Sequence, residues 1–149
     1  MEDISHNLQY PLHHLEDLLF PLFSKNYTND SLRVTIESAN HIWCAYEHGK
    51  CIACALITDI GTQGGLYIIL FGVQESEQGR GIGTRLLTSI IQWSRIHRYR
   101  FLYLHTEYDN ANAIRLYEKA GFEKNVSQLV YTEQLPQFGS DVLSMMLFI

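Results

Sequence analysis

One stretch of sequence decides the fold of this chain: Val73-Gln74-Glu75-Ser76-Glu77-Gln78-Gly79-Arg80-Gly81-Ile82-Gly83-Thr84-Arg85-Leu86-Leu87. The residues before it, 66–73, are apolar on both faces, as expected for a central strand that is covered from both sides. The residues after the glycines have helical periodicity, with Ile82, Leu86, Ile90 and Trp93 on one stripe. A buried strand is therefore expected to run through a glycine-rich turn into an amphipathic helix.

The glycine-rich turn predicts an anion site. Glycines let backbone N–H groups approach an anion closely, and the first turn of the helix adds unpaired donors and the positive end of the helix dipole. Arg80 and Arg85 add positive charge, and Thr84 adds a hydroxyl. The alternative interpretation is a turn whose glycines serve only the close packing of helix on strand.

Two common phosphate-binding motifs do not fit this turn. A P-loop needs Lys-Ser or Lys-Thr after its final glycine, whereas this chain has Thr84-Arg85. The dinucleotide fingerprint needs a glycine in place of Thr84 and an acidic residue about 20 positions later, but the next acidic residue after Glu77 is Glu107. Neither motif is present.

The segments on either side predict an α/β fold. Upstream we expect a short edge strand around residues 4–8, a helix from Pro11 that ends or kinks at Pro21, a loop over residues 24–31, and strands over residues 41–47 and 51–59. Downstream we expect a strand over residues 101–106, a helix capped by Asp109 or Asn110, and strands over residues 126–132 and 142–149. This order predicts a central, mixed, mostly antiparallel twisted sheet of about six to seven strands with helices on both faces.

Composition and charge favour one domain over residues 1–149 and disfavour several functional classes. The chain has 149 residues, of which 46% are apolar, and a net charge of −5. A nucleic-acid-binding surface would be basic, and a membrane helix needs an apolar run of about 20 residues, so we expect neither kind of partner. The acidic N-terminal residues differ from a secretory signal, and three cysteines do not suit a disulfide framework. We therefore expect a cytoplasmic protein.

The cysteines also predict no metal site. Positions three apart on a strand point to opposite faces, so Cys51 and Cys54 are expected to diverge. No second pair completes a tetrahedral ligand set with Cys44, and buried packing is the simpler interpretation.

Two motifs carry a family resemblance. Gln78-Gly79-Arg80-Gly81-Ile82-Gly83 matches the pattern (Arg/Gln)-x-x-Gly-x-(Gly/Ala), and residues 110–122 have the form Asn-x-x-Ala, then Leu-Tyr, then Gly-Phe. Together, in this order, they resemble the GNAT N-acetyltransferase superfamily. The match is good over residues 66–122, whereas the N-terminal third is similar only in its order of elements.

The resemblance implies that acetyl-CoA binds as co-substrate in a notch between the central strand and the strand of residues 101–106. Backbone N–H groups of the glycine-rich turn would hold the pyrophosphate, and the central strand would pair with the pantetheine and polarise the thioester carbonyl. The residues expected to bind acetyl-CoA are Phe71, Gly72, Val73, Gln78, Gly79, Arg80, Gly81, Ile82, Gly83, Thr84, Asn110, Ala113 and Tyr117.

The resemblance also gives candidates for the chemistry. Tyr117 matches the acid that protonates the leaving thiol in the family, although its ring also lies on the apolar stripe of its helix. Several relatives use a central-strand glutamate as base, eleven residues before the Gln of the signature, where this chain has Tyr67. Candidates for the base are therefore the nearby residues Glu75, Glu107, Asp109 and His105.

The activity implied is acetyl transfer from acetyl-CoA to a primary amine by direct attack in a ternary complex. The acidic composition favours a cationic acceptor, such as a polyamine, an aminoglycoside or a lysine-bearing peptide. Because 149 residues leave little room for a peptide-docking insertion, we expect a small-molecule amine, with a protein lysine or N-terminus as the alternative. Because the central-strand glutamate is missing, a non-catalytic module that binds acyl-CoA is the alternative. The apolar segment 142–149 would suit a buried strand or the interface of a homodimer.

Overall fold

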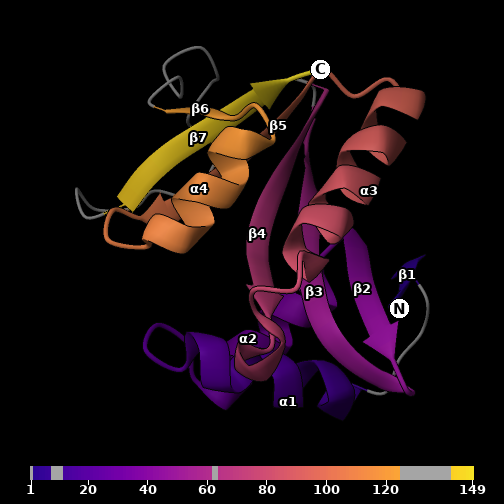
Figure 1. Ribbon diagram of the computed structural model, residues 1–149, viewed down its shortest axis with the longest axis vertical. Coiled ribbons are helices and arrows are strands. Elements are labelled where there is room, and N and C mark those ends of the chain that lie inside the picture. Colours follow the sequence, from indigo (N-terminus) through magenta and orange to yellow (C-terminus); the bar gives the residue numbers. More distant parts are fainter. Residues whose placement is uncertain (1, 8–11, 62–63, 125–141) are drawn as a thin grey trace.

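The computed structural model describes residues 2–7, 12–61, 64–124 and 142–149. In chain order the elements are β1 (Asp3–His6), α1 (Leu12–Phe23), α2 (Asn29–Ser38), β2 (His41–Glu47), β3 (Lys50–Ile60), β4 (Gly65–Val73), the 3₁₀ turn η2 (Glu75–Glu77), α3 (Ile82–Ile96), β5 (Phe101–Glu107), α4 (Ala111–Lys119), β6 (Glu123–Lys124) and β7 (Val142–Phe148) (Figure 1). The strand, glycine-rich turn and helix around residues 73–87 lie where the sequence predicted them.

The strands form one seven-stranded sheet in the order β1-β2-β3-β4-β5-β7-β6. Every neighbouring pair is antiparallel except β4 and β5, which are parallel. The predicted mixed, mostly antiparallel sheet is therefore confirmed. The closing strand β7 pairs with β5 and β6 of its own chain.

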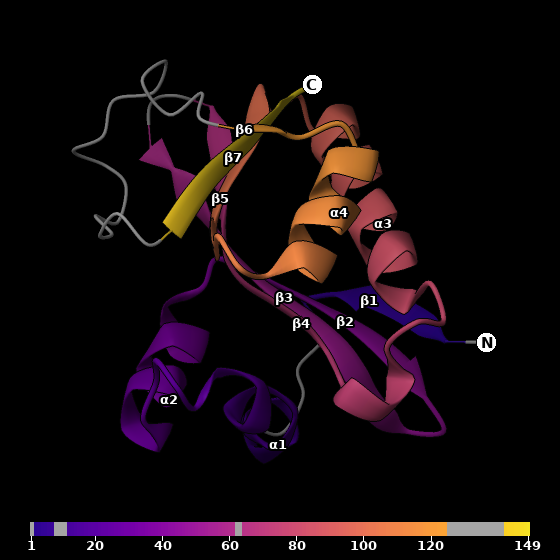
Figure 2. The same ribbon diagram turned by 60° about the vertical axis from the view of Figure 1, so that its left-hand side comes forward.

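Helices cover both faces of the sheet, as predicted. Figure 2 shows α1 and α2 on one side of the sheet and α3 and α4 on the other. The α3 side is packed by buried residues that include Leu86 and Ile90, and the α1 side by residues that include Leu19 and Leu32. Among the described helices none is long and apolar enough to cross a membrane.

The loop predicted over residues 24–31 is wrong from Asn29 onward, because α2 begins there. Thr28 and Ser31 form a capping box: the Thr28 hydroxyl accepts from the Ser31 N–H (3.0 Å), and the Ser31 hydroxyl accepts from the Thr28 N–H (2.8 Å). The polar composition of this segment favoured a loop, but its threonine and serine instead cap the start of a helix. Likewise Pro21 does not end α1, which continues to Phe23.

The expected divergence of the cysteines is also wrong. Cys44 pairs with Cys54 across β2 and β3, and the register then shifts so that Tyr46 pairs with Cys51. This β-bulge reverses the alternation of side chains, and all three cysteines lie in one buried cluster on the α1 side. Within the described ranges no group of three or more metal-ligating side chains could hold a metal ion.

Near the C-terminus, the strand predicted over residues 126–132 lies outside the described residues. The strand predicted over residues 142–149 is confirmed as β7.

Candidate functional site

The sheet opens between its two parallel strands. β4 and β5 pair only from Gly65 to Ile68 and from Phe101 to Leu104, although β4 continues to Val73 and β5 to Glu107. A bulge in β4 lies at the same point, because Ile68 and Leu70 face consecutive residues of β3. Beyond Ile68 the edge of β4 that faces β5 has no strand partner among the described residues. A free edge of this kind can pair with an extended ligand.

The glycine-rich turn presents unpaired backbone donors next to this opening. Gly79 and Gly81 have φ angles of +87° and +79°, and Gly81 precedes the first residue of α3. In the described part of the chain, no protein group accepts a hydrogen bond from the backbone N–H groups of residues 79–84, and the first helical bond runs from Arg85 N to Gly81 O (3.1 Å). We call these six consecutive amides, which lead into and form the first turn of a 15-residue helix, the cradle, because unpaired donors at a helix N-terminus suit an anion.

The other residues of this segment contribute in different ways. The N–H of Gln78 donates to Glu75 O (3.3 Å), so it is not part of the cradle, while the Gln78 side chain donates to Val73 O (3.1 Å) and ties the turn to β4. Ile82 is 1% exposed, so only its backbone is available to a ligand. Thr84 is exposed in the first turn of α3.

The two arginines of the turn are not free cations. Arg80 forms ion pairs with Glu47 (Nη2 to Oε2, 3.0 Å) and with Glu77. Arg85 forms a two-bond pair with Glu2, and this contact holds the pKa of the Glu2 carboxyl at about 2. Because carboxylates compensate both charges, attraction for an anion comes mainly from the backbone amides and the helix dipole.

Tyr117 and Phe71 meet where α4 covers β4. Their ring centroids are 6.0 Å apart with the rings nearly perpendicular, and Tyr117 also contacts Phe122. Asn110 caps α4, accepting from the N–H of Ala113 (3.2 Å), as one of the two capping alternatives predicted. Burial raises the pKa of Tyr117, which therefore stays protonated at neutral pH. The expected packing of this ring in the core is confirmed, because Tyr117 is buried among the residues of the α3 side; its role as an acid stays a prediction.

Close packing against β4 depends on one glycine of the strand itself. A Cβ on Gly83 would lie 3.4 Å from Val73 and 3.6 Å from Phe71, which are ordinary contact distances, so the packing of α3 on β4 does not require Gly83. A Cβ on Gly72 would lie 2.8 Å from Leu22, so this glycine lets α1 approach the other face of the strand.

Two tyrosines and a histidine gather on the opposite face of the sheet. The Tyr67 hydroxyl lies 2.9 Å from Nδ1 of His105, and the Tyr103 hydroxyl lies 3.4 Å from Nε2. Burial raises the pKa of Tyr67 and lowers that of His105. His105 is the first residue of β5 beyond its pairing with β4. The sequence marked Tyr67 only as the position at which several relatives have a glutamate. The contact between Tyr67 and His105 was not predicted.

Two of the predicted acidic candidates, Glu107 and Glu75, have surroundings of their own. Glu107 accepts from the Asn26 side chain (3.2 Å) and pairs with Lys25 (3.8 Å). Glu75 lies in η2 and lines a cavity of about 780 Å³ with Asp17 of α1 and residues of the β2–β3 turn. Within the described ranges no contact joins either carboxylate to Tyr117.

A family model described as "Acetyltransferase (GNAT) family" matches residues 10–122. The chain belongs to the GNAT acetyltransferase family. This GNAT chain is 33% identical over 63 residues to the spermine/spermidine N(1)-acetyltransferase of Bacillus subtilis, an alignment that covers 42% of this chain and 41% of that protein. It is 25% identical over 141 residues to N-alpha-acetyltransferase 50 of Danio rerio, covering 93% of this chain and 82% of that protein.

Solved structures share the fold of this GNAT chain. The ribosomal-protein-S18-alanine N-acetyltransferase from Escherichia coli has a TM-score of 0.76 at 20% identity and covers 100% of this chain and 94% of its own. A Bacillus subtilis acetyltransferase in complex with CoA also has a TM-score of 0.76, at 18% identity, and covers 100% and 99% of the two chains. At these identities the likeness concerns the fold alone.

Proposed function

We propose that this GNAT chain transfers the acetyl group of acetyl-CoA to a primary amine. The observation that carries the proposal is the run of six unpaired amides at residues 79–84, beside the free edge of β4. These groups fit a diphosphate followed by an extended chain, because the amides can bind the anion and the strand edge can pair with pantetheine. A Cβ on Gly79 would meet nothing within 4 Å, so the cradle is open at this residue.

The residues of the opening have separate tasks in this proposal. The amides of residues 79–84 and the Thr84 hydroxyl would hold the pyrophosphate, and the backbone of residues 71–73 would align the pantetheine. Bound acetyl-CoA supplies a thioester whose carbonyl carbon the amine attacks. Asn110 and Ala113 would line the thiol end, where the Tyr117 hydroxyl donates its proton to the leaving sulfur.

Tyr67 and His105 can accept the proton that the amine must lose. A neutral histidine has one N–H and one bare nitrogen, so one tyrosine can donate to it while the other accepts. With Tyr67 donating to Nδ1, the amine proton passes to the Tyr67 oxygen as the Tyr67 proton moves to His105. The low pKa of His105 keeps this acceptor neutral at physiological pH but makes it a weak base.

A weak base suits an α-amine better than an alkyl amine. Deprotonation at pH 7 costs about 4.6 kcal/mol for a lysine-like amine, with its pKa near 10.4, but only about 1.4 kcal/mol for an α-amine with a pKa near 8. The nearby carboxylate Glu107 is already paired with Lys25. The relative that aligns with 93% of this chain is an N-alpha-acetyltransferase. We therefore favour the α-amine of a peptide over the small cationic amine that length and composition favoured.

The small cationic amine is the second candidate, supported by the 33% identity to a spermine/spermidine acetyltransferase. Release of free thiol from acetyl-CoA should be measured with three acceptors. The first is a peptide with a free N-terminus, the second is the same peptide with its N-terminus blocked and with a lysine in its sequence, and the third is spermidine. We expect turnover of the first at least about tenfold above the others, given the difference in deprotonation cost. Turnover of spermidine alone would favour the second candidate, and CoA binding without any turnover would favour a non-catalytic binding module.

Substitution of Gly81 by alanine should weaken CoA binding about 5- to 30-fold, since a left-handed backbone costs a residue with a Cβ about 1–2 kcal/mol. Its φ is +79°, and the new Cβ would lie 3.0 Å from Arg85 Nη1, so the turn must shift to relieve the strain. Calorimetric titration with CoA checks this result. Gly64→Ala is the matched control, because its φ is +73° and its Cβ would also meet an arginine side chain, Arg100 at 3.2 Å. Equal CoA affinity of the two variants would contradict the cradle.

A further inference from the structure

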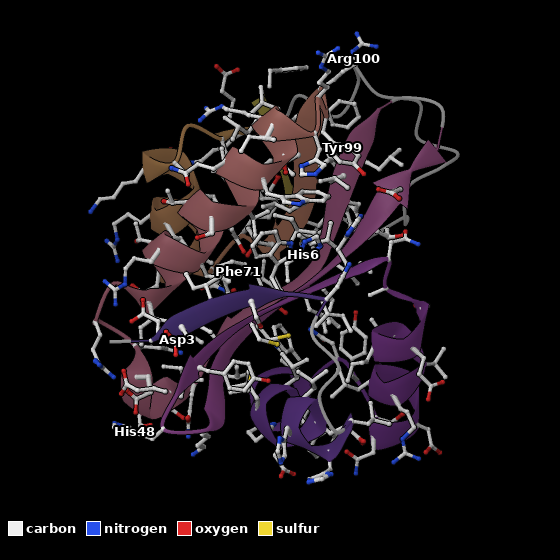
Figure 3. All side chains as sticks on the ribbon, turned by 90° about the vertical axis from the view of Figure 1, so that its right-hand side faces the viewer. Asp3, His6, His48, Phe71, Tyr99 and Arg100 are labelled. Atoms are coloured by element: carbon white, nitrogen blue, oxygen red, sulfur yellow. The ribbon has the colours of Figure 1, made fainter. Side chains whose placement is uncertain are left out.

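The first strand of the chain reaches the glycine-rich turn through Glu2. β1 lies at the edge of the sheet, antiparallel to β2, and Figure 3 shows it in front of the sheet, marked by Asp3 and His6, with α3 above it. The Glu2 carboxylate accepts two hydrogen bonds from Arg85, one from Nε and one from Nη2 (2.9 Å). The Glu2 side chain is 2% exposed, whereas that of Arg85 is 42% exposed.

The same guanidinium contacts the backbone of the turn. Nη2 of Arg85 also donates to the carbonyl oxygen of Arg80 (3.2 Å), and Nη1 lies 3.0 Å from where a Cβ of Gly81 would be. The C=O of Arg80 and the N–H of Gly81 belong to one trans peptide, so they point in opposite directions. Holding the carbonyl toward Arg85 therefore directs the Gly81 N–H away from it.

We propose that Glu2 and Arg85 are positioning residues for CoA binding: Glu2 fixes the Arg85 guanidinium, which holds the Arg80 carbonyl and keeps the Gly81 N–H directed at the diphosphate. The inference rests on the proposed function. It adds a positioning role for Glu2 and Arg85, which no sequence motif connects with each other. Neither side chain needs to touch the ligand.

Geometry rather than charge is the contribution of Arg85 in this proposal. Its charge is matched by a carboxylate that stays ionised at neutral pH, because the contact with Arg85 lowers the pKa of Glu2 to about 2. Its planar fork makes two bonds to Glu2 and a third contact to the Arg80 carbonyl. A lysine would keep the charge but could not reproduce this fixed set of donors.

The test is a double-mutant cycle with Arg85→Lys, Glu2→Gln and the double variant, measured as calorimetric CoA affinity and as kcat and KM for acetyl-CoA. We expect each single variant to raise the Kd and the KM about 3- to 10-fold, as expected for the loss of one well-placed hydrogen bond. The double variant should be no weaker than the worse single variant, because both changes release the same carbonyl. The kcat and the KM for the amine should stay unchanged.

Two substitutions of the same kind at exposed positions serve as controls: Arg95→Lys on the last turn of α3 and Glu37→Gln on α2. Both should bind CoA like the wild type. Thermal unfolding of every variant separates stability from affinity, and the chemical shift of the Gly81 amide during CoA titration shows whether this N–H still meets the ligand where a variant is less stable.

The outcomes distinguish this inference from the proposed function. If the wild-type chain does not bind CoA, the proposed function fails. If the wild type binds CoA and Arg85→Lys binds it equally well, the positioning role is overturned, even where the variant unfolds at a lower temperature. Additive losses in the double variant, or tighter binding by Glu2→Gln, would also overturn it, because they would indicate independent charge effects.

Discussion

Replacing Tyr117 by phenylalanine should lower kcat for acetyl transfer by about 100-fold, the lower end of the range for general acid catalysis. The leaving thiol must gain a proton, and the Tyr117 hydroxyl, whose pKa burial raises above its usual value, carries one at neutral pH. Phenylalanine keeps the ring contacts with Phe71 and Phe122, so CoA affinity and the melting temperature should change little. Steady-state kinetics and calorimetric titration with CoA measure the two effects separately.

The control for this variant is Tyr99→Phe. It also removes the hydroxyl of a partly buried tyrosine, which donates to Asp59 (3.0 Å), but Tyr99 lies outside the opening between β4 and β5. It should leave kcat unchanged. An unchanged kcat in Tyr117→Phe would mean that the ring serves only the packing of α4 against β4.

The second large effect is expected at His105. His105→Asn keeps a polar partner for Tyr67 but removes the base, and kcat should fall by about 100-fold. The base works only as neutral imidazole, and its pKa in the folded chain lies below the usual 6.5. The wild-type kcat should therefore be constant at neutral pH and fall as the pH drops through that lowered pKa. The acid limb should be absent in the variant.

His48→Asn is the matched control, since His48 is exposed in the β2–β3 turn and has a positive φ of +54°, which asparagine tolerates. Tyr67→Phe should give a smaller loss, about tenfold, because His105 remains and the proton can reach it through water. An acid limb that persists in His105→Asn would assign the titration to another group.

The sequence predicted most of the sheet because its strands carry strong local signals. The apolar run before Gln74 and the glycines after it mark a buried strand entering a helix, and the structure has this arrangement. The helix α2 was missed because its start depends on two reciprocal hydrogen bonds between Thr28 and Ser31, and composition alone favours a loop there. The cysteine cluster was missed because a β-bulge shifts the register, which strand alternation does not reveal.

The cradle was predicted, whereas the ion pairs around it were not. Glycines favour positive φ angles, so the residue types at positions 79 and 81 already indicated the backbone conformation that the turn has. The partners of the arginines are distant: Glu2 lies 83 residues from Arg85, and Glu47 lies 33 residues from Arg80. Only the order and register of β1, β2 and β3 bring these carboxylates to the turn, and pairing of this range is not readable from local pattern.

The same limit applies to the proposed proton acceptor. Tyr67 and His105 are 38 residues apart and meet because β4 and β5 pair in parallel up to the point where the sheet opens. Comparison of the sequence motifs shows only that β4 lacks the glutamate of several relatives. The sequence placed His105 near the end of a predicted strand, but the point where β4 and β5 stop pairing and the partner of His105 depend on the register.

The cradle is tested most directly by recording the backbone amide resonances of residues 79–84 while CoA is added, and again while pantetheine, which lacks the diphosphate, is added. We predict large shifts of the Gly79, Gly81 and Gly83 amides with CoA and small ones with pantetheine, since these N–H groups have no protein acceptor in the described structure. Saturation with CoA that leaves these three amides unshifted would contradict the account.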